Sequence, residues 1–141
     1  MSFDTLGDLN WLAVIVATIV YMALGAIWYQ PFAFGRIWSE ASGVPMPEPG
    51  ESAPPTIYLS PLIAYFLSTV ATAMLARATG SETLGHAIVL GIVVGVGYVV
   101  ALTMVGATFE PKPKGAVWFA ITAGFNVLAL VIVSVIVTLW H

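Results

Sequence analysis

Four apolar segments, each close to the length of a membrane crossing, constrain this chain more than any other feature. They cover residues 11–29, 56–77, 84–107 and 116–140. A helix of about 20 apolar residues crosses the ~30 Å hydrocarbon core of a bilayer. Only 8% of the residues are charged, whereas a soluble domain carries roughly 25%. The sequence therefore predicts an all-α integral membrane protein. We expect one membrane domain over residues 1–141, with four transmembrane helices in an antiparallel up-down bundle.

The positions of the tryptophans agree with this assignment. Trp11 and Trp28 bracket the first segment, and Trp118 and Trp140 bracket the fourth. At about 1.5 Å per helical residue, these spacings correspond to roughly 25 and 33 Å, close to the thickness of a bilayer core. Trp38 falls in the connection after the first segment. Tryptophan prefers the boundary between hydrocarbon and water, so every tryptophan lies where a membrane boundary is predicted.

The connection over residues 30–55 is the one long loop, and its two halves differ. The second half is acidic and rich in proline, which favours an extended and mobile chain. The first half is aromatic, with a single arginine, which is typical of a segment held in the headgroup region. We therefore predict an anchor at the membrane boundary, formed by Trp28, Tyr29, Pro31, Phe34, Gly35, Arg36 and Trp38.

The charges of the loops predict an orientation. The two other connections are short, which makes the second, third and fourth helices antiparallel neighbours. Arg36, Lys112 and Lys114 share one side of the membrane, and Arg77 is on the other. Cytoplasmic loops carry the excess of Lys and Arg. The long loop and the Lys112–Lys114 turn are therefore predicted in the cytoplasm, with both termini outside.

Small residues at four-residue spacing predict how the helices pack. Lipid is as apolar as leucine, so helices in a membrane associate through close contact at small residues. The predicted packing positions are Ser60, Ala64, Ser68 and Thr72 in the second segment, Gly91 and Gly95 in the third, and Ala120 and Gly124 in the fourth. These stripes either build the bundle itself, the favoured interpretation, or face outward to a partner. The second segment is then the best candidate.

Pro61 allows two interpretations of the second segment. It either begins the helix in its first turn, behind Ser60, or kinks a helix that began earlier.

Charged groups argue against several functions. None of the seven Asp and Glu residues lies in a predicted span, whereas ion- and proton-coupled transporters depend on intramembrane ionisable groups. With no cysteine, the chain has no disulfide or thiol chemistry. There is no cluster of Lys and Arg for nucleic acid to bind, and no basic start typical of a cleaved signal. No catalytic residue, metal ligand or cofactor is predicted.

Asn126 and Tyr98 are the predicted buried polar residues. An amide in hydrocarbon needs a hydrogen-bond partner. The expected partners of Asn126 are Ser68, Thr69, Thr103 or Tyr98. The alternative is a polar contact to a ligand. Tyr21, Tyr65 and Tyr98 lie at similar depth, so a small polar network is expected.

His86 and His141 offer a weaker alternative. Both lie on the side of the membrane that holds Trp11, so a haem or metal site is conceivable. No carboxylate is spaced to complete such a site, and an interfacial His86 bonded to the adjacent loop is the favoured interpretation.

The first third of the chain resembles the bacterial family catalogued as domain of unknown function 1761. The resemblance starts at residues 10–14, NWLAV, and continues through Gly25, Ala26, Trp28, Tyr29, Pro31, Phe34, Gly35 and Trp38. This chain has Gln30 where members usually have Ser, and Arg36 where Lys is frequent. The resemblance implies a small four-helix membrane protein of the bacterial inner membrane, and it supplies no substrate or catalytic residue.

Together these features predict a non-enzymatic membrane protein whose partners are the lipid bilayer and either a second copy or another membrane protein. It would act as a homo-oligomer or as an accessory subunit. An alternative is an oligomeric carrier or pore for a small neutral or apolar solute, built around Asn126 and the tyrosines. A membrane enzyme or haem protein that uses His86 is the third hypothesis.

Overall fold

The computed structural model describes residues 1–140, and every regular element in that range is helical. The elements are η1 (Phe3–Asp8), α1 (Trp11–Trp28), α2 (Gly35–Ser42), α3 (Thr56–Ala78), α4 (Leu84–Val94), η2 (Gly95–Val100), α5 (Ala101–Phe109) and α6 (Gly115–Leu139). Within this range four stretches are long and apolar enough to cross a membrane: α1, α3, the continuous stretch Leu84–Phe109, and α6. The predicted all-α fold with four membrane-spanning helices is confirmed.

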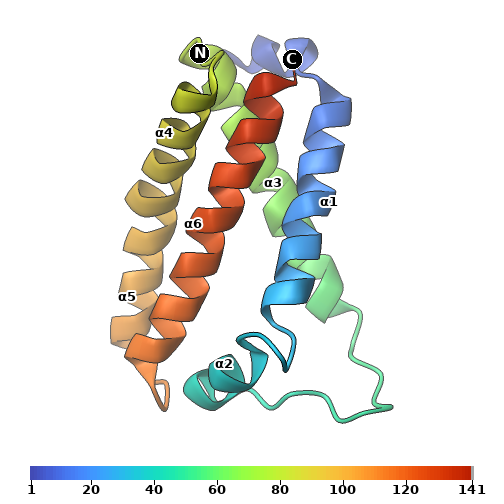
Figure 1. The fold of residues 1–141 in the computed structure, drawn as a ribbon, viewed down its shortest axis with the longest axis vertical. Helices are drawn as coiled ribbons and strands as arrows, with labels where there is room; N and C mark the ends of the chain where they lie inside the picture. The colour runs from blue at the N-terminus through green and yellow to red at the C-terminus, as the bar shows by residue number, and fades with distance from the viewer. Residues whose placement is uncertain (141) are drawn as a thin grey trace.

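The long helices lie side by side, and the chain reverses direction from each one to the next (Figure 1). The two marked chain ends lie at the same end of the bundle. The short helix α2 lies across the opposite end. The long loop after α2 then leads along that end to the start of α3.

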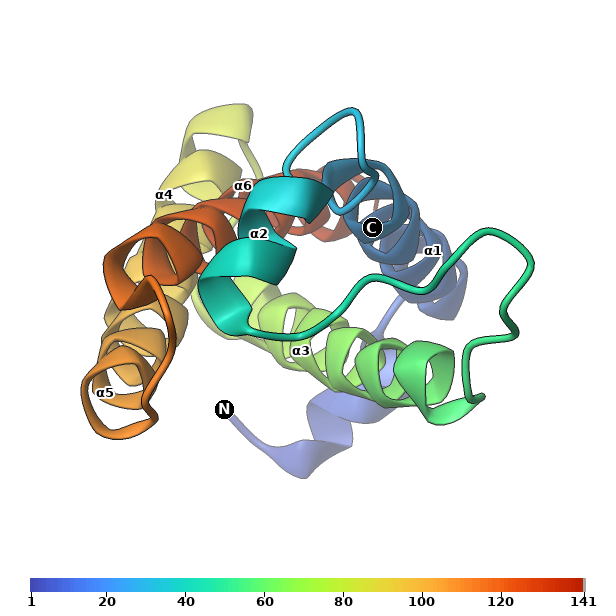
Figure 2. The same ribbon diagram turned by 90° about the horizontal axis from the view of Figure 1, so that it is seen from below.

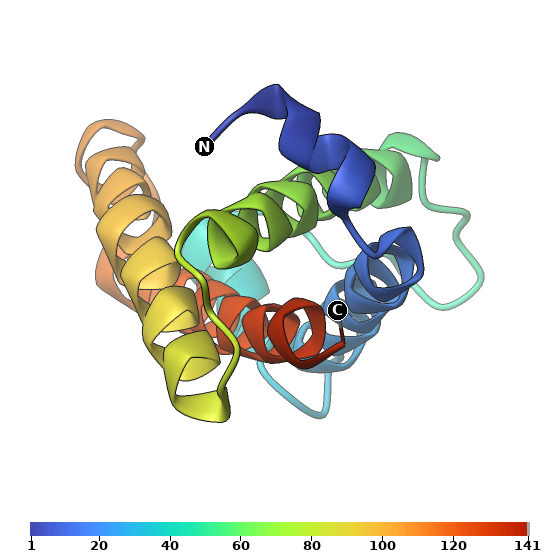
Figure 3. The same ribbon diagram turned by 90° about the horizontal axis from the view of Figure 1, so that it is seen from above.

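Helix α6 is the centre of the packing. It contacts α1, α3, α4 and α5, and α2 as well. Viewed from either end, α6 lies between α4–α5 on one side and α1 on the other (Figures 2 and 3). The last helix in the sequence therefore holds the others together.

The core along α6 is built largely from small side chains. Ala129 and Val133 of α6, with Ala13, Val14 and Ala17 of α1, are almost completely buried. Small side chains let helix backbones come close, which is how helices associate when lipid competes equally well for apolar surface.

Three buried threonines bond their hydroxyls to the backbone of their own helix. The side chains of Thr18, Thr69 and Thr72 donate to backbone carbonyls four residues earlier, at 2.7–2.8 Å. Such bonds need no neighbouring helix, so a threonine can be buried among alkyl groups without an unpaired hydroxyl.

Pro61 lies inside α3, which begins at Thr56 after Pro55. The interpretation that Pro61 starts the helix behind Ser60 is therefore wrong. Proline has no N–H, so the carbonyl of Ile57 has no donor four residues later and lacks its usual helical hydrogen bond.

The third span changes helix type near its middle. Between α4 and α5, η2 is a π-helical turn over Gly95–Val100. A π-helix closes i→i+5 hydrogen bonds and is wider than an α-helix, so it alters which side chains share a face before and after it.

Candidate functional site

The turn after α1 is fixed by backbone hydrogen bonds. The N–H of Phe34 donates to the Trp28 carbonyl and that of Gly35 donates to the Gln30 carbonyl, both at 3.0 Å. The N–H of Tyr29 also donates to the Gly25 carbonyl at 3.1 Å. These bonds fold the chain sharply back at the end of the first span, so α2 begins close to where α1 ends.

Gly35 is the residue that this turn requires. A Cβ atom added there would overlap the carbonyl oxygen of Tyr29 and would lie 2.8 Å from that of Gln30. Both are backbone atoms, so no rotation of a side chain could make room. Only glycine fits without opening the turn.

Helix α2 is attached to α6 and its N-cap residue, Lys114, by two hydrogen bonds and by an ion pair of Glu40 with Lys114 at 3.6 Å. The indole N–H of Trp38 donates to the hydroxyl of Thr122 at 3.1 Å. The backbone N–H of Lys114 donates to the carbonyl of Ala41 at 3.1 Å. The chain then leaves α2 at Gly43, whose φ of 77° is the left-handed conformation that glycine favours.

Seven aromatic side chains meet near Phe125 of α6. Phe125 is 1% exposed, and four ring centroids lie 5.4–6.2 Å from its own, in tilted or edge-on geometry. These four rings belong to Tyr21, Trp28, Tyr29 and Tyr65. Phe34 packs on Trp28 at 4.5 Å, and Trp38 on Tyr29 at 5.4 Å. We call these seven residues the Phe125 cluster. Such pairs contribute about 0.5–1.5 kcal/mol each beyond simple burial.

A polar pair lies next to the cluster at the level of Tyr21. The Tyr21 hydroxyl donates to Oδ1 of Asn126 at 2.6 Å, and Nδ2 of Asn126 donates to the Thr122 carbonyl at 2.9 Å. Tyr21 also stacks on Tyr65, with centroids 3.9 Å apart and rings nearly parallel. The partner of Asn126 is therefore none of the four residues that the sequence suggested.

The predicted anchor residues divide into two groups. Trp28, Tyr29 and Trp38 turn toward α6, as members of the cluster. Pro31 and Arg36 are exposed, and Gly35 is buried in the turn. Phe34 lies between the two groups, since it is 39% exposed while its ring packs on Trp28. Arg36 makes no ion pair within residues 1–140. The segment thus has an inner aromatic face on the bundle and an outer face free to meet lipid headgroups.

The predicted small-residue stripes also divide. Gly91 and Gly95 face α6, where added Cβ atoms would lie 2.5 Å from Cα of Val131 and 3.2 Å from Cα of Val127. Thr72 is buried and Ser68 is half-buried. The remaining predicted packing positions are exposed: Ser60, Ala64, Ala120 and Gly124. Packing inside the bundle therefore accounts for only part of the small-residue surface.

Tyr98 is not buried, which corrects the prediction. It lies in η2 and is 64% exposed. The prediction followed from the depth of Tyr98 near the middle of the span, which does not determine the side of the helix that a residue faces. Within the π turn Gly95 is buried and Tyr98 is exposed. A π turn spaces residues around the helix differently from an α-helix.

The histidine hypothesis gains no ligand set from the structure. His86 is exposed in the first turn of α4, which is capped by the Thr83 hydroxyl. Across residues 1–140, no three His, Asp or Glu side chains gather in a way that could hold a metal ion. His141 lies outside the described residues.

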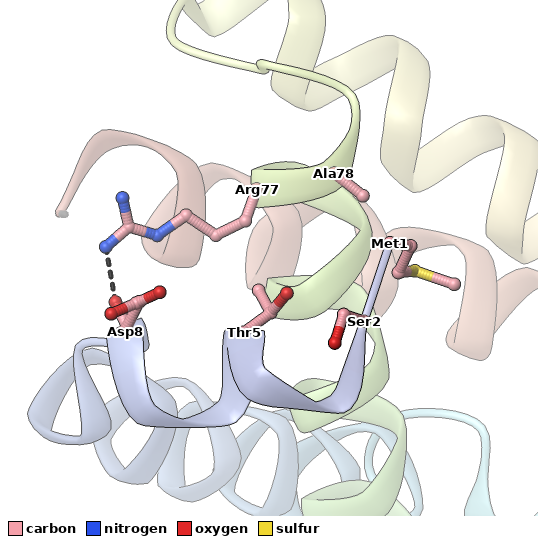
Figure 4. A pocket seen from close by; sticks show the side chains of 6 residues that line it. All are labelled: Met1, Ser2, Thr5, Asp8, Arg77 and Ala78. Atoms are coloured by element: carbon pink, nitrogen blue, oxygen red, sulfur yellow. Dashed lines mark hydrogen bonds between the residues drawn. The ribbon is translucent and has the colours of Figure 1, made fainter.

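An open pocket of about 650 Å³ lies at the end of the bundle that holds η1. There the guanidinium of Arg77, at the end of α3, donates to the backbone carbonyl of Asp8 (Figure 4). Ser2 and Thr5 also line it. The Arg77 contact fastens η1 onto α3. Arg77 and Asp8 place opposite charges on the wall of the pocket.

A family profile described as "Protein of unknown function (DUF1761)" matches residues 12–138, nearly the whole chain. The chain belongs to the DUF1761 family. No curated protein and no solved structure matches it. The structure therefore shows how the residues of this DUF1761 chain are arranged, but no matched protein indicates an activity.

The motif that carried the resemblance coincides with the turn and cluster of this DUF1761 chain. Gly25 lies against Phe125, with an added Cβ 3.3 Å from Cζ of that ring. Gly35 allows the turn, and Trp28, Tyr29, Phe34 and Trp38 supply its rings. Sequence reasoning missed Phe125 and Thr122, the α6 residues that this motif contacts. The available signal was their position beside Asn126, at the depth of the tyrosines.

Proposed function

We propose that this protein is a non-enzymatic membrane component that works by association, either as a homo-oligomer or as an accessory subunit of a larger membrane complex. One observation carries the proposal: the bundle leaves a prepared helix-packing surface uncovered. The outer half of α3 presents Ser60 and Ala64 to the surroundings, whereas Thr72 and Ala76 of the same stripe are buried.

A groove of about 430 Å³ runs along this uncovered half of α3. It is lined by Thr56, Leu59, Ser60, Ile63, Ala64 and Leu67. Its lining combines small side chains with leucine and isoleucine. A second helix could approach this backbone closely and place its side chains in the groove. That is how helices associate in lipid, where burying apolar surface gives no advantage by itself.

The orientation is part of the proposal. We place the α2 end of the bundle in the cytoplasm of a bacterial inner membrane, and the η1 end outside. The support is the distribution of cations: Arg36, Lys112 and Lys114 lie in the loops of the α2 end, and Arg77 lies at the other end.

The carrier hypothesis has less support. Both ends of the Asn126 amide bond to other groups of the bundle, Tyr21 and the Thr122 carbonyl. A solute would have to displace an existing hydrogen bond to use this amide, so the geometry favours a structural role for it.

Substitution of Ala64 by leucine tests the proposal. Ala64→Leu fills the groove, so the assembly size measured in mild detergent should fall while membrane insertion stays normal. Ala23→Leu is the matched control, because Ala23 is an exposed alanine on α1. An assembly of unchanged size in Ala64→Leu would remove α3 as the association surface. A single chain with no co-purifying protein before any substitution would remove the proposal.

A further inference from the structure

The third span is the least covered of the four. Of its most apolar stretch, 11% is buried within the described chain, compared with 39% for α6. Its buried residues are Ala87, Leu90, Gly91 and Gly95, and the two glycines lie against α6. Val94 and Val99 are partly buried against the core, and the remaining side of this long helix is exposed, along the side of the molecule opposite α1 (Figure 3).

Tyr98 places a hydroxyl on that uncovered face near the middle of the span. It lies about 21 Å along the helix from Leu84 and about 16 Å from Phe109, at 1.5 Å per residue. A tyrosine side chain is too short to reach the headgroups from that depth. The hydroxyl of Tyr98 forms no hydrogen bond with any residue within 1–140.

The other hydroxyls of the span need no partner. Thr103 donates to the Val99 carbonyl at 2.6 Å and Thr108 donates to the Met104 carbonyl at 3.0 Å. A tyrosine hydroxyl lies too far from its own backbone to do the same. In hydrocarbon there is no water to bond it, so an uncovered Tyr98 hydroxyl is costly.

The surface next to Tyr98 is suited to close contact. Gly97 has no heavy atom within 4 Å of where its Cβ would lie, and Ala101, four residues further on, is exposed. Two small residues at this spacing let a second helix backbone approach. Such a helix would come within reach of the tyrosine hydroxyl between them.

We propose that a second copy of this chain covers this face, with Tyr98 of each copy bonded to Tyr98 of the other across a two-fold axis along the membrane normal. This inference rests on the proposal that the protein works by association. Two copies inserted in the same direction hold Tyr98 at equal depth. A hydroxyl both donates and accepts, so it is complementary to its own copy. A different partner would need its own polar group at that depth.

Disulfide trapping in native membranes tests this inference. The chain has no cysteine, so single-cysteine variants give a clean readout. Ala101→Cys should form a disulfide-linked dimer on mild oxidation, because a disulfide requires Cα atoms within about 7 Å. Ile19→Cys is the control, since Ile19 is exposed near the middle of α1. Ala64→Cys reports on the α3 groove.

A second variant isolates the hydroxyl. Tyr98→Phe in the Ala101→Cys background should reduce the trapped dimer by about threefold or more, the factor that an average interhelical hydrogen bond contributes in a membrane. The amount of inserted protein should not change, because the Tyr98 hydroxyl has no partner in the bundle and phenylalanine keeps the ring.

The outcomes separate the two proposals. Trapping of Ala101→Cys at the rate of Ile19→Cys, while Ala64→Cys is trapped, overturns this inference and leaves association standing. Trapping of Ala101→Cys to a different protein also overturns it. An unchanged yield with Tyr98→Phe removes the hydroxyl pair. No trapping at any position, with a single chain in the membrane, overturns both proposals.

Discussion

The hydroxyl of Tyr21 in α1 donates a 2.6 Å hydrogen bond to Oδ1 of Asn126 in α6. The two residues are 105 positions apart, and this bond joins the first and last spans. Asn126 also donates to the Thr122 carbonyl of its own helix, which fixes the direction of the amide. The pair therefore sets the relative position of two helices at one depth, beside the Phe125 cluster.

Removal of this amide should destabilise the bundle. Asn126→Leu leaves the buried Tyr21 hydroxyl without an acceptor, and we expect a loss of about 1–3 kcal/mol in the free energy of unfolding. Tyr21→Phe leaves Oδ1 of Asn126 without its donor, so it should also destabilise the bundle. Unfolding in mixed detergent micelles measures both. Equal stability of Asn126→Leu and the unsubstituted protein would show that the bond contributes nothing.

The two substitutions combined should cost less than their sum. The coupling energy expected from membrane double-mutant cycles is about 0.6 kcal/mol, and up to about 1.7 kcal/mol. A coupling of zero would mean that the two residues do not interact in the membrane.

Gly35→Ala should open the turn between α1 and α2. The added methyl group meets backbone carbonyls, so we expect a cost of about 1–3 kcal/mol, as for other overpacked sites. Release of α2 should also increase hydrogen exchange over Gly35–Ser42. Gly124→Ala is the control, because no heavy atom lies within 4 Å of its added Cβ. Similar exchange in both variants would contradict the tight turn.

Gly91→Ala should separate the third span from α6. Its Cβ would lie 2.5 Å from Cα of Val131, and neither backbone can move without shifting its helix. We expect a loss of about 1–3 kcal/mol in the free energy of unfolding. Gly106→Ala on the same span is the control, since its nearest heavy atoms lie at 3.9 Å. In unfolding measurements, Gly91→Ala should be less stable than Gly106→Ala.

The proposed orientation predicts which loops react from outside the cell. Single cysteines at Ser52, in the long loop, and at Ser81, between α3 and α4, can be treated with a thiol reagent that does not cross the membrane. The Ser81→Cys variant should react in intact cells, and Ser52→Cys only after the membrane is opened. The reverse pattern would invert the orientation without changing the fold.

The sequence was sufficient for the spans because their signal is local. Hydrophobic length and the spacing of Trp11 and Trp28 depend only on the neighbouring residues and on the thickness of the bilayer. The same holds for the contact of Gly91 and Gly95 with a neighbour, since glycine at four-residue spacing is a packing signal in any helix.

The site was less predictable because it depends on rotation between helices. The depth of Asn126 was visible, but its partner Tyr21 follows from how α1 and α6 are turned toward each other. The prediction that Tyr98 is buried failed for a related reason. The π turn at Gly95–Val100 changes the helical repeat, and no residue in that stretch predicts a π turn. The bond of Trp38 to Thr122 could not be predicted, because it is a contact between segments far apart in the sequence.

The number of chains in one particle of native membrane tests whether this protein works by association. The protein should be extracted with its surrounding lipid, without detergent, and its particles weighed by mass spectrometry. We expect two or more copies of this chain in a particle, or one copy with a defined second protein. Particles that hold one chain and lipid alone, at every concentration examined, would contradict it.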